Sequence, residues 1–243
     1  MTDCGPRYAI YFAPAPESAL WRFGAATIGY DAASGRDIPT MPPVGYEHAV
    51  WGRLTEEPRR YGFHATLKAP FHLAMGPSEA QLLAAVRDFS ARSVAQPIGR
   101  LQVSCIGSFV ALTVIGDATP INHFAADVMR AFEPYRAPLS KADRSRRLTV
   151  PLSKRQIAYL DRFGYPYVCE EFRFHLTLTG ALPQAMREPV RQALAEAYTR
   201  SVSSAPSLLD ALSVVKQDRR DGRFRLIARF PFPDHRRSRA AVP

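Results

Sequence analysis

The chain has 243 residues, of which 47% are hydrophobic and 22% charged, and 32 Lys and Arg against 22 Asp and Glu give it a formal net charge of +10. This length can bury a sizeable apolar core without disulfides or metals, and no apolar run approaches the roughly 18–20 residues that span a bilayer, so we expect a globular protein without a membrane anchor. The positive charge favours anionic partners, nucleic acid and small phosphates alike.

The N-terminus and the cysteines carry no targeting or redox signal. Residues 1–6 lack a basic stretch that leads into an apolar core, so we expect no secretory signal and a cytoplasmic location. Cys4, Cys105 and Cys169 are odd in number and lack the paired spacing of a zinc site or a redox motif. We therefore interpret them as reduced thiols without a chemical role.

The first half of the chain predicts a strand at residues 7–13, a helix at 17–23 and then a segment with the sequence Phe63-His64-Ala65-Thr66-Leu67. After a proline break, the apolar spacing predicts a helix over 78–90 that begins near Pro77 or Ser78. Two strands follow at 101–106 and 109–115, joined across Gly107 and Ser108.

The middle and the second half continue in the same manner. Helices are expected over 121–132 and 153–163, and the basic stretch 136–151 between them is interpreted as a solvated loop. A second segment, Phe174-His175-Leu176-Thr177-Leu178, precedes a helix over 185–200 and strands over 208–215 and 224–230. The last two strands are joined by Asp221-Gly222, a strong hairpin signal.

The two halves share an order and a length, which predicts an internal duplication. Each Phe-His-x-Thr-Leu segment is followed by a helix and a strand hairpin, and the distance from the histidine to the hairpin glycine is similar in both halves. The expected fold class is α+β: a single domain over 1–232 with lobes at about 7–116 and 117–232, whose two small antiparallel sheets face a central cleft with helices outside. Residues 233–243 are predicted to be a disordered basic tail.

Strand alternation places the histidine and the threonine of each segment on one face. His175, Thr177 and the neighbouring Arg173 share a side, opposite Phe174 and Leu176. In the first copy the expected polar side holds Arg60, His64, Thr66 and Lys68. Each strand thus offers a histidine, a hydroxyl and a cation.

Two histidines at equivalent positions suit general acid–base catalysis at phosphorus. A neutral imidazole accepts a proton from the nucleophile while a charged one donates a proton to the departing oxygen. Thr66 and Thr177 would bind the non-bridging oxygens, with Lys68 or Arg173 as charge partners. A lone His-x-Thr is more often a hydrogen-bonded structural pair, but two copies within matching units favour one active site. No metal or cofactor is expected, because the remaining histidines form no ligand cluster and no GxxxxGK[ST] or GxGxxG loop occurs.

The paired motifs resemble those of the two-histidine (2H) phosphoesterase superfamily, in which His64, Thr66, His175 and Thr177 match the catalytic histidines and the phosphate-binding hydroxyls. The flanking sequences at 7–12, 60–71 and 162–168 are similar to a bacterial branch associated with phosphonate metabolism, and the resemblance runs from about residue 7 to 232. It implies a LigT-like two-lobed fold and a metal-independent phosphodiesterase that acts on a small cyclic phosphate ester. Tyr11, Arg60 and Tyr61 are further candidates for substrate binding.

Two other functions remain open. The basic stretch 136–147 would suit RNA-end processing by a 2′,3′-cyclic phosphodiesterase, although Tyr135 is the one aromatic residue near it for stacking bases, so RNA ranks below a small phosphate substrate. A sensor that binds a phosphate ester without turnover is the second alternative. The sequence leaves the physiological substrate, the acid and base assignment and the oligomeric state open.

Overall fold

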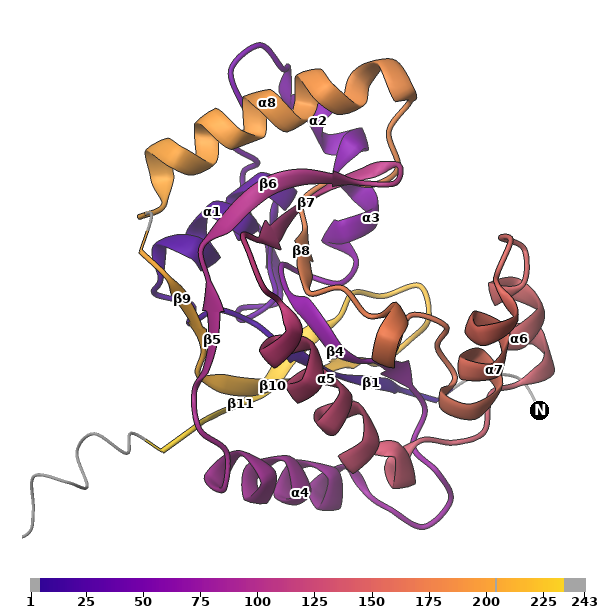
Figure 1. Ribbon diagram of the computed structural model, residues 1–243. Coiled ribbons are helices and arrows are strands. Elements are labelled where there is room, and N and C mark those ends of the chain that lie inside the picture. The colour runs from indigo at the N-terminus through magenta and orange to yellow at the C-terminus, as the bar shows by residue number, and fades with distance from the viewer. Residues whose placement is uncertain (1–4, 204, 234–243) are drawn as a thin grey trace, which may run out of the picture.

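The computed structural model describes residues 5–203 and 205–233, which form an α+β fold of small antiparallel sheets with helices packed against them (Figure 1). Cys4 and the predicted tail from residue 234 onward lie outside the described residues. The strands are β1 (Arg7–Phe12), β2 (Tyr30–Asp31), β3 (Arg36–Asp37), β4 (Ala65–Phe71), β5 (Gln96–Gly99), β6 (Leu101–Ile106), β7 (Phe109–Val114), β8 (His175–Thr177), β9 (Ser207–Leu209), β10 (Ala211–Gln217) and β11 (Arg225–Pro231). The helices are α1 (Ala19–Ile28), α2 (His48–Leu54), α3 (Glu56–Arg59), α4 (Glu79–Ala91), α5 (Thr119–Ala131), α6 (Lys141–Arg147), α7 (Lys154–Phe163) and α8 (Gln184–Ser201), with short 3-10 turns η1 (Glu133–Tyr135) and η2 (Cys169–Glu171).

Two sheets carry the predicted segments. A four-stranded sheet has the order β11-β10-β1-β4, and a three-stranded sheet has the order β6-β7-β8. The strands β4 and β8, at one edge of each sheet, contact each other. The meeting of the two sheets therefore brings Thr66 of β4 and Thr177 of β8 to neighbouring strands.

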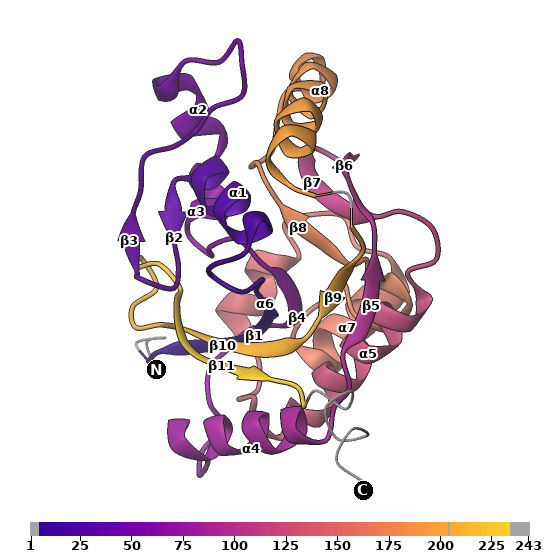
Figure 2. The ribbon, with the colours of Figure 1, turned by 90° about the vertical axis from the view of Figure 1, so that its left-hand side faces the viewer.

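The helices and hairpins of the two halves are exchanged. Helix α4 packs against the β10–β11 hairpin of the second half, whereas α8 packs against the β6–β7 hairpin of the first half. Figure 1 and Figure 2 show these two helices at opposite ends of the molecule. Each sheet takes strands from both predicted ranges, 7–116 and 117–232, so these ranges do not coincide with the two sheets. The reciprocal packing is what two equivalent units would produce, and the duplication itself remains a prediction.

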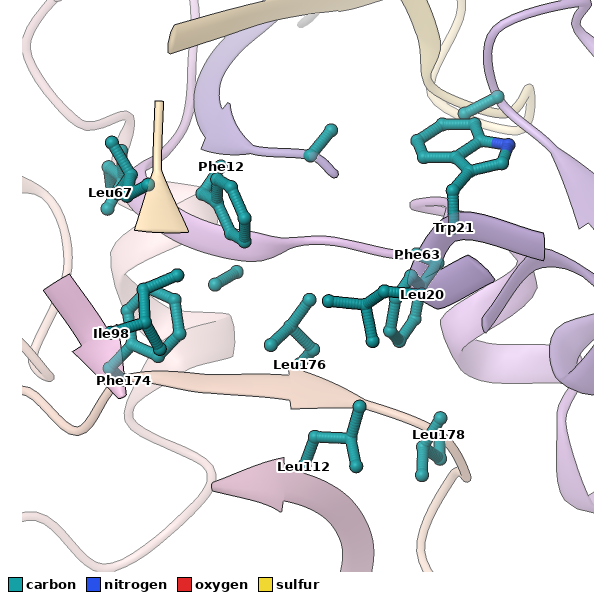
Figure 3. Packing of buried hydrophobic residues seen from close by; sticks show 14 of the residues in the cluster. Phe12, Leu20, Trp21, Phe63, Leu67, Ile98, Leu112, Phe174, Leu176 and Leu178 are labelled. Carbon is teal, nitrogen blue, oxygen red and sulfur yellow. The ribbon is translucent and has the colours of Figure 1, made fainter. Parts of the chain in front are cut away.

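The main core lies on one face of both sheets. Ile10 and Phe12 of β1 lie in one buried cluster with Leu112 of β7, Leu176 of β8 and Phe174, which precedes β8. The ring centroids of Phe12 and Phe174 are 6.0 Å apart, and Figure 3 shows both rings in the cluster. Alternation along β1 turns Ala9 and Tyr11 to the opposite face, where they pack with Val215 and Phe224. That opposite face is the one that bears the histidines.

The helix start at Ser78 and the hairpin at Asp221-Gly222 form as predicted, and Ser153 provides a second helix cap. Ser78 and Ser153 each cap a helix by accepting a hydrogen bond from the backbone N–H of Gln81 and Gln156, and both glutamines complete a capping box. The hairpin at Gly222 joins β10 to β11. None of the described helices has the length and apolar character to cross a membrane.

The interpretation of residues 136–151 as a loop is wrong for its central part. Residues 141–147 form α6, whose N-terminus is capped by the Ser140 side chain, which accepts a hydrogen bond from the Asp143 N–H. Arg144, Arg146 and Arg147 lie in its last turn, where positive charge complements the helix dipole. The dense arginine content concealed a helix seven residues long, too short to show an apolar period.

Candidate active site

The two histidines are positioned by their apolar neighbours. In the first copy Phe63, Ala65 and Leu67 are buried, and in the second copy Phe174, Leu176 and Leu178 are buried. Because side chains alternate along an extended chain, burial of these residues in the main core turns the intervening His and Thr side chains to the opposite face. The half-buried side chains on that face are His64, Thr66, His175 and Thr177.

Both imidazoles are held in the same way. Nδ1 of His64 lies 2.8 Å from the carbonyl oxygen of Gly62, and Nδ1 of His175 lies 2.7 Å from the carbonyl oxygen of Arg173. A carbonyl only accepts, so Nδ1 of each histidine carries the hydrogen, and the neutral ring has its lone pair on Nε2. Nε2 of His64 lies 3.0 Å from Oγ1 of Thr66, whose hydroxyl donates to it. The two histidines therefore share one tautomer and one backbone contact, to the residue two positions before.

Both histidines line one cavity. It has a volume of about 450 Å³ and includes Thr66 and Thr177 together with His64 and His175. Its other lining residues include Arg7, Tyr11, Tyr61, Phe109, Arg147 and Tyr165. The structure thus brings together all four residues of the two His-x-Thr pairs, which lie more than 100 positions apart along the chain.

Burial lowers the pKa of both imidazoles. The pKa of His64 falls from 6.5 to about 4, because burial disfavours the charged ring and the nearby His175 acts in the same direction, while the bond to the Gly62 carbonyl opposes them. Burial likewise lowers the pKa of His175, against the opposing bond to the Arg173 carbonyl. At neutral pH both imidazoles are therefore neutral, and each is able to accept a proton.

Tyr11 supports His64 directly. The two rings are stacked with centroids 3.6 Å apart and planes 15° from parallel. The Tyr11 side chain is 1% exposed, its hydroxyl has no hydrogen-bond partner among the described residues, and burial raises its pKa well above the usual value. A buried hydroxyl without a partner costs about 1–3 kcal/mol, so its retention here needs a reason beyond packing.

The other predicted binding residues are divided by the structure. Tyr11 and Tyr61 line the histidine cavity, and Arg173 lines an adjoining cavity of about 460 Å³ that also includes His175. Arg60 lines neither cavity, and its carbonyl accepts a hydrogen bond from the Phe224 N–H. Lys68 does not reach the histidine cavity either.

A β-bulge explains the position of Lys68. In the pairing of β1 with β4, Tyr11 lies opposite Thr66 while the preceding residue, Ile10, lies opposite Lys68, so β4 has one extra residue between the two pairs. The extra residue breaks the alternation and turns Lys68 into the protein interior. There its Nζ lies 2.7 Å from Oε2 of Glu133 and 3.1 Å from the carbonyl oxygen of Met129, and the side chain is 3% exposed.

Two cations of the cavity, Arg7 and Arg147, were not predicted from the alternation of side chains along the strands. Arg7 lies on β1, and Arg147 is the last residue of α6, with its guanidinium 5.1 Å from the centre of the Tyr165 ring. Both line the histidine cavity. The sequence offered one signal, the basic stretch that contains Arg147, but nothing in it indicates which of its five basic residues would point inward. Within residues 5–203 and 205–233 no group of three or more His, Cys, Asp or Glu side chains is placed to hold a metal ion.

Comparison with known proteins identifies one family. Residues 66–225, about two thirds of the chain, match the family described as "Protein of unknown function (DUF1045)". The matched range includes Thr66, His175 and Thr177 and begins two residues after His64.

Two curated relatives carry the name "Ribose 1,5-bisphosphate phosphokinase PhnN". The protein of Janthinobacterium sp. (strain Marseille) is 35% identical over 240 residues, which are 98% of this chain and 53% of the relative. The protein of Laribacter hongkongensis (strain HLHK9) is 36% identical over 178 residues, which are 73% of this chain and 41% of the relative. The chain spans about half the length of the curated relatives it matches.

Proposed function

Since the chain belongs to the family described as "Protein of unknown function (DUF1045)", a description that names no reaction, we propose from the geometry of its cavity that it hydrolyses a small cyclic phosphate ester by paired-histidine acid–base catalysis. The observation that carries this proposal is the equivalence of the two imidazoles. Both have Nδ1 bound to the carbonyl two residues before, both leave Nε2 as the titrating atom, and both line one cavity with a threonine beside them.

The proposed reaction divides two proton transfers between the histidines. Nε2 of one neutral imidazole removes a proton from water as the water oxygen bonds to phosphorus. The ring P–O bond breaks, and the second histidine, protonated at Nε2, donates its proton to the departing oxygen, which leaves a phosphate monoester and a free hydroxyl. The Thr66 and Thr177 hydroxyls would bind the non-bridging oxygens. Because both proton transfers are assigned to imidazoles, the reaction needs no metal-bound water.

We assign His64 as the base and His175 as the acid. The pKa of His64, at about 4, keeps this ring neutral at physiological pH, as a base requires. His175 must be protonated to donate. A bound phosphodiester anion favours the protonated ring and so counteracts the effect of burial on its pKa.

Hydrolysis of adenosine 2′,3′-cyclic phosphate, followed by phosphorus NMR with and without a chelator, tests the reaction. His64→Ala and His175→Ala should each lower kcat roughly 100- to 10,000-fold, whereas His123→Ala, at an exposed position of α5, should not. Undiminished turnover in both active-site variants contradicts the proposal. Stoichiometric binding without product in the unaltered protein would favour the phosphate-ester sensor instead.

A leaving-group series separates the acid from the base. The p-nitrophenolate of a p-nitrophenyl phosphodiester leaves phosphorus without protonation, so His175→Ala should lose much less activity on this substrate than on the cyclic ester. The loss in His64→Ala should be similar on both substrates, because water needs deprotonation in either case. The opposite pattern reverses the assignment.

The names of the relatives contain both a sugar phosphate and a kinase activity, and only the sugar phosphate is carried into this proposal. The relatives are named for ribose 1,5-bisphosphate, and the resemblance to the phosphonate-associated branch is consistent with a cyclic ribose phosphate as the substrate. The chain has no GxxxxGK[ST] sequence to cradle a nucleotide triphosphate. Phosphoryl transfer from a nucleotide is therefore not proposed for it.

The structure weakens the RNA alternative. On α6, Arg144 pairs with Asp161 of α7 at 2.6 Å and Arg146 pairs with Asp143 at 2.9 Å, so two of the four basic residues are locally neutralised. Arg147 points into the cavity. A surface that follows a nucleic-acid backbone needs several free cations along its length, and with Arg147 turned to the cavity α6 is left with Lys141 alone.

A further inference from the structure

Neither arginine of the histidine cavity has a carboxylate partner among residues 5–203 and 205–233. In the described part of the chain, no Asp or Glu lies within ion-pair distance of the guanidinium of Arg7 or of Arg147. Arg7 donates to the side-chain oxygen of the neutral Gln217, with Nε 2.8 Å from Oε1, and Arg147 lies over the Tyr165 ring. This separates Arg147 from Arg144 and Arg146 on the same helix, which are both paired.

The cavity holds two half-buried positive charges, those of Arg7 and Arg147. Burial lowers the pKa of Arg147, and the nearby charge of Arg7 acts in the same direction. Tyr165 and Asp143 oppose this lowering. Glu57 is the one acidic residue among the described cavity-lining residues, and it is exposed. Asp143 is held by Arg146 and Arg220. Two cations that repel each other without a counterion favour an anionic ligand between them.

The buried hydroxyl of Tyr11 lies in the same region. Tyr11 lines the same cavity as Arg7 and Arg147, and its hydroxyl lacks a hydrogen-bond partner among the described residues. A hydroxyl donor in a cavity that two guanidinium groups also line adds to the groups that can bind phosphate oxygens.

The cations lie to one side of the histidines. Arg7, Arg147 and Tyr165 also line an adjoining cavity of about 410 Å³, which includes none of His64, Thr66, His175 and Thr177. Arg173 and Phe109 lie on the side of the other adjoining cavity, with His175. The arginines therefore mark a position next to the reacting phosphorus and distinct from it.

We propose that Arg7 and Arg147 form a second anion subsite, so that the substrate carries a phosphate monoester in addition to the cyclic diester. This rests on the proposed function for the identity of the reacting group. The subsite selects a doubly phosphorylated compound over a cyclic phosphate without the second group. Guanidinium groups suit this role because they remain charged and bind phosphate oxygens in pairs.

The test compares adenosine 2′,3′-cyclic phosphate with its 5′-phosphorylated form. Calorimetric binding is measured in the His64→Ala, His175→Ala double variant, which does not turn the ligands over. The 5′-phosphorylated ligand should bind at least tenfold more tightly than its partner. Adding Arg147→Gln should remove most of this preference and leave the affinity for the singly phosphorylated ligand within about twofold; Arg7→Gln, made separately, should do the same.

The matched control is Lys141→Gln, which removes one exposed positive charge from the same helix and should keep the full preference at the same salt concentration. Equal affinities for the two ligands before any arginine is replaced, or an equal loss for both ligands in Arg147→Gln, overturns the subsite. Thermal melting of each variant identifies a folding defect, and Arg147→Lys provides a folded alternative that keeps the charge but loses paired binding.

The two proposals fail in different ways. A preference for the doubly phosphorylated ligand without hydrolysis in the unaltered protein would retain the subsite and reject the phosphodiesterase. Hydrolysis of both ligands with equal kcat/KM and equal affinity would retain the phosphodiesterase and reject the subsite.

Discussion

The tautomer of each active-site histidine is set by the backbone two residues before it. In both segments Nδ1 of the histidine at position i donates to the carbonyl of residue i−2, which is Gly62 in the first and Arg173 in the second. Gly62 has a φ of 78°, in the left-handed region that favours glycine, and an added Cβ there would lie 2.7 Å from the Cβ of Ala32. The backbone bond that orients His64 therefore depends on glycine two residues before it.

The lowered pKa of His64 makes stability depend on pH. The unfolded chain takes up a proton near pH 6.5, whereas the folded protein does so only near pH 4. The stability contributed by the neutral ring is therefore fully present above pH 6.5 and is lost as the pH falls toward 4. Between pH 7 and pH 4 the unfolding free energy of the unaltered protein decreases, and in His64→Gln this decrease should be smaller by on the order of 2–3 kcal/mol. Urea denaturation at both pH values measures it.

His123→Gln is the control for this measurement, because it removes an exposed imidazole from α5 and should leave the decrease as it is in the unaltered protein. A His64→Gln protein that loses as much stability on acidification as the unaltered one would show that burial does not lower the pKa of His64.

The bulge in β4 determines which side chains this strand supplies to the histidine cavity. Without it, Thr66 and Lys68 would share a face, and the lysine would enter the cavity. With it, Lys68 joins Glu133 in the interior, and Glu133 also binds Arg136 at 2.6 Å. The cationic role in the cavity is then open to Arg7 of the neighbouring strand and to Arg147 of α6.

The Lys68–Glu133 pair should act on stability and not on catalysis. Glu133→Gln leaves a buried ammonium without its counterion and should lower the unfolding free energy by roughly 3–5 kcal/mol in urea denaturation. Lys68→Met removes the buried charge and keeps a linear side chain, so it should cost less. The kcat/KM of Lys68→Met on the cyclic ester should stay within about twofold of that of the unaltered protein. A hundredfold loss would show that Lys68 takes part in catalysis or substrate binding.

Helix α6 is docked by ion pairs rather than by an apolar face. Arg144 connects it to Asp161 of α7, and Asp143 connects it to Arg220 near the β10–β11 turn. None of its residues is fully buried. These polar connections orient the last turn so that Arg147 reaches the cavity.

In the whole molecule, the packing of α1 is coupled to the site through Phe63. Gly24 of α1 faces the Phe63 ring so closely that an added Cβ would lie 2.1 Å from its carbon atoms. Phe63 precedes His64, so a shift of the ring is expected to move the imidazole. The close approach of helix and ring therefore requires glycine at this position.

Gly24→Ala should lower the unfolding free energy by roughly 1–3 kcal/mol through overpacking, despite the better helix propensity of alanine, and should also lower kcat. Gly52→Ala in α2 is the matched control, because its added Cβ would have one neighbouring atom, Nη2 of Arg59, at 3.9 Å. It should raise stability by about 0.5–1 kcal/mol. Both quantities come from urea denaturation and steady-state kinetics, and an equal gain in both variants would contradict the coupling.

Much of the fold followed from local patterns. Ser78 predicted the start of α4, and the alternation of Phe174, Leu176 and Leu178 predicted which face of β8 is buried. The short helices α2, α3 and α6 were missed, because four to seven residues show too little apolar period to be recognised.

The sequence by itself determined the face on which His64, Thr66, His175 and Thr177 lie, because alternation along an extended chain is a local property. Only the tertiary structure decided which cations accompany them. An extra residue in β4 turned Lys68 inward, and ion pairs between α6 and distant elements brought Arg147 to the cavity. Register shifts and docking depend on contacts between segments far apart in the chain, and no local pattern encodes them.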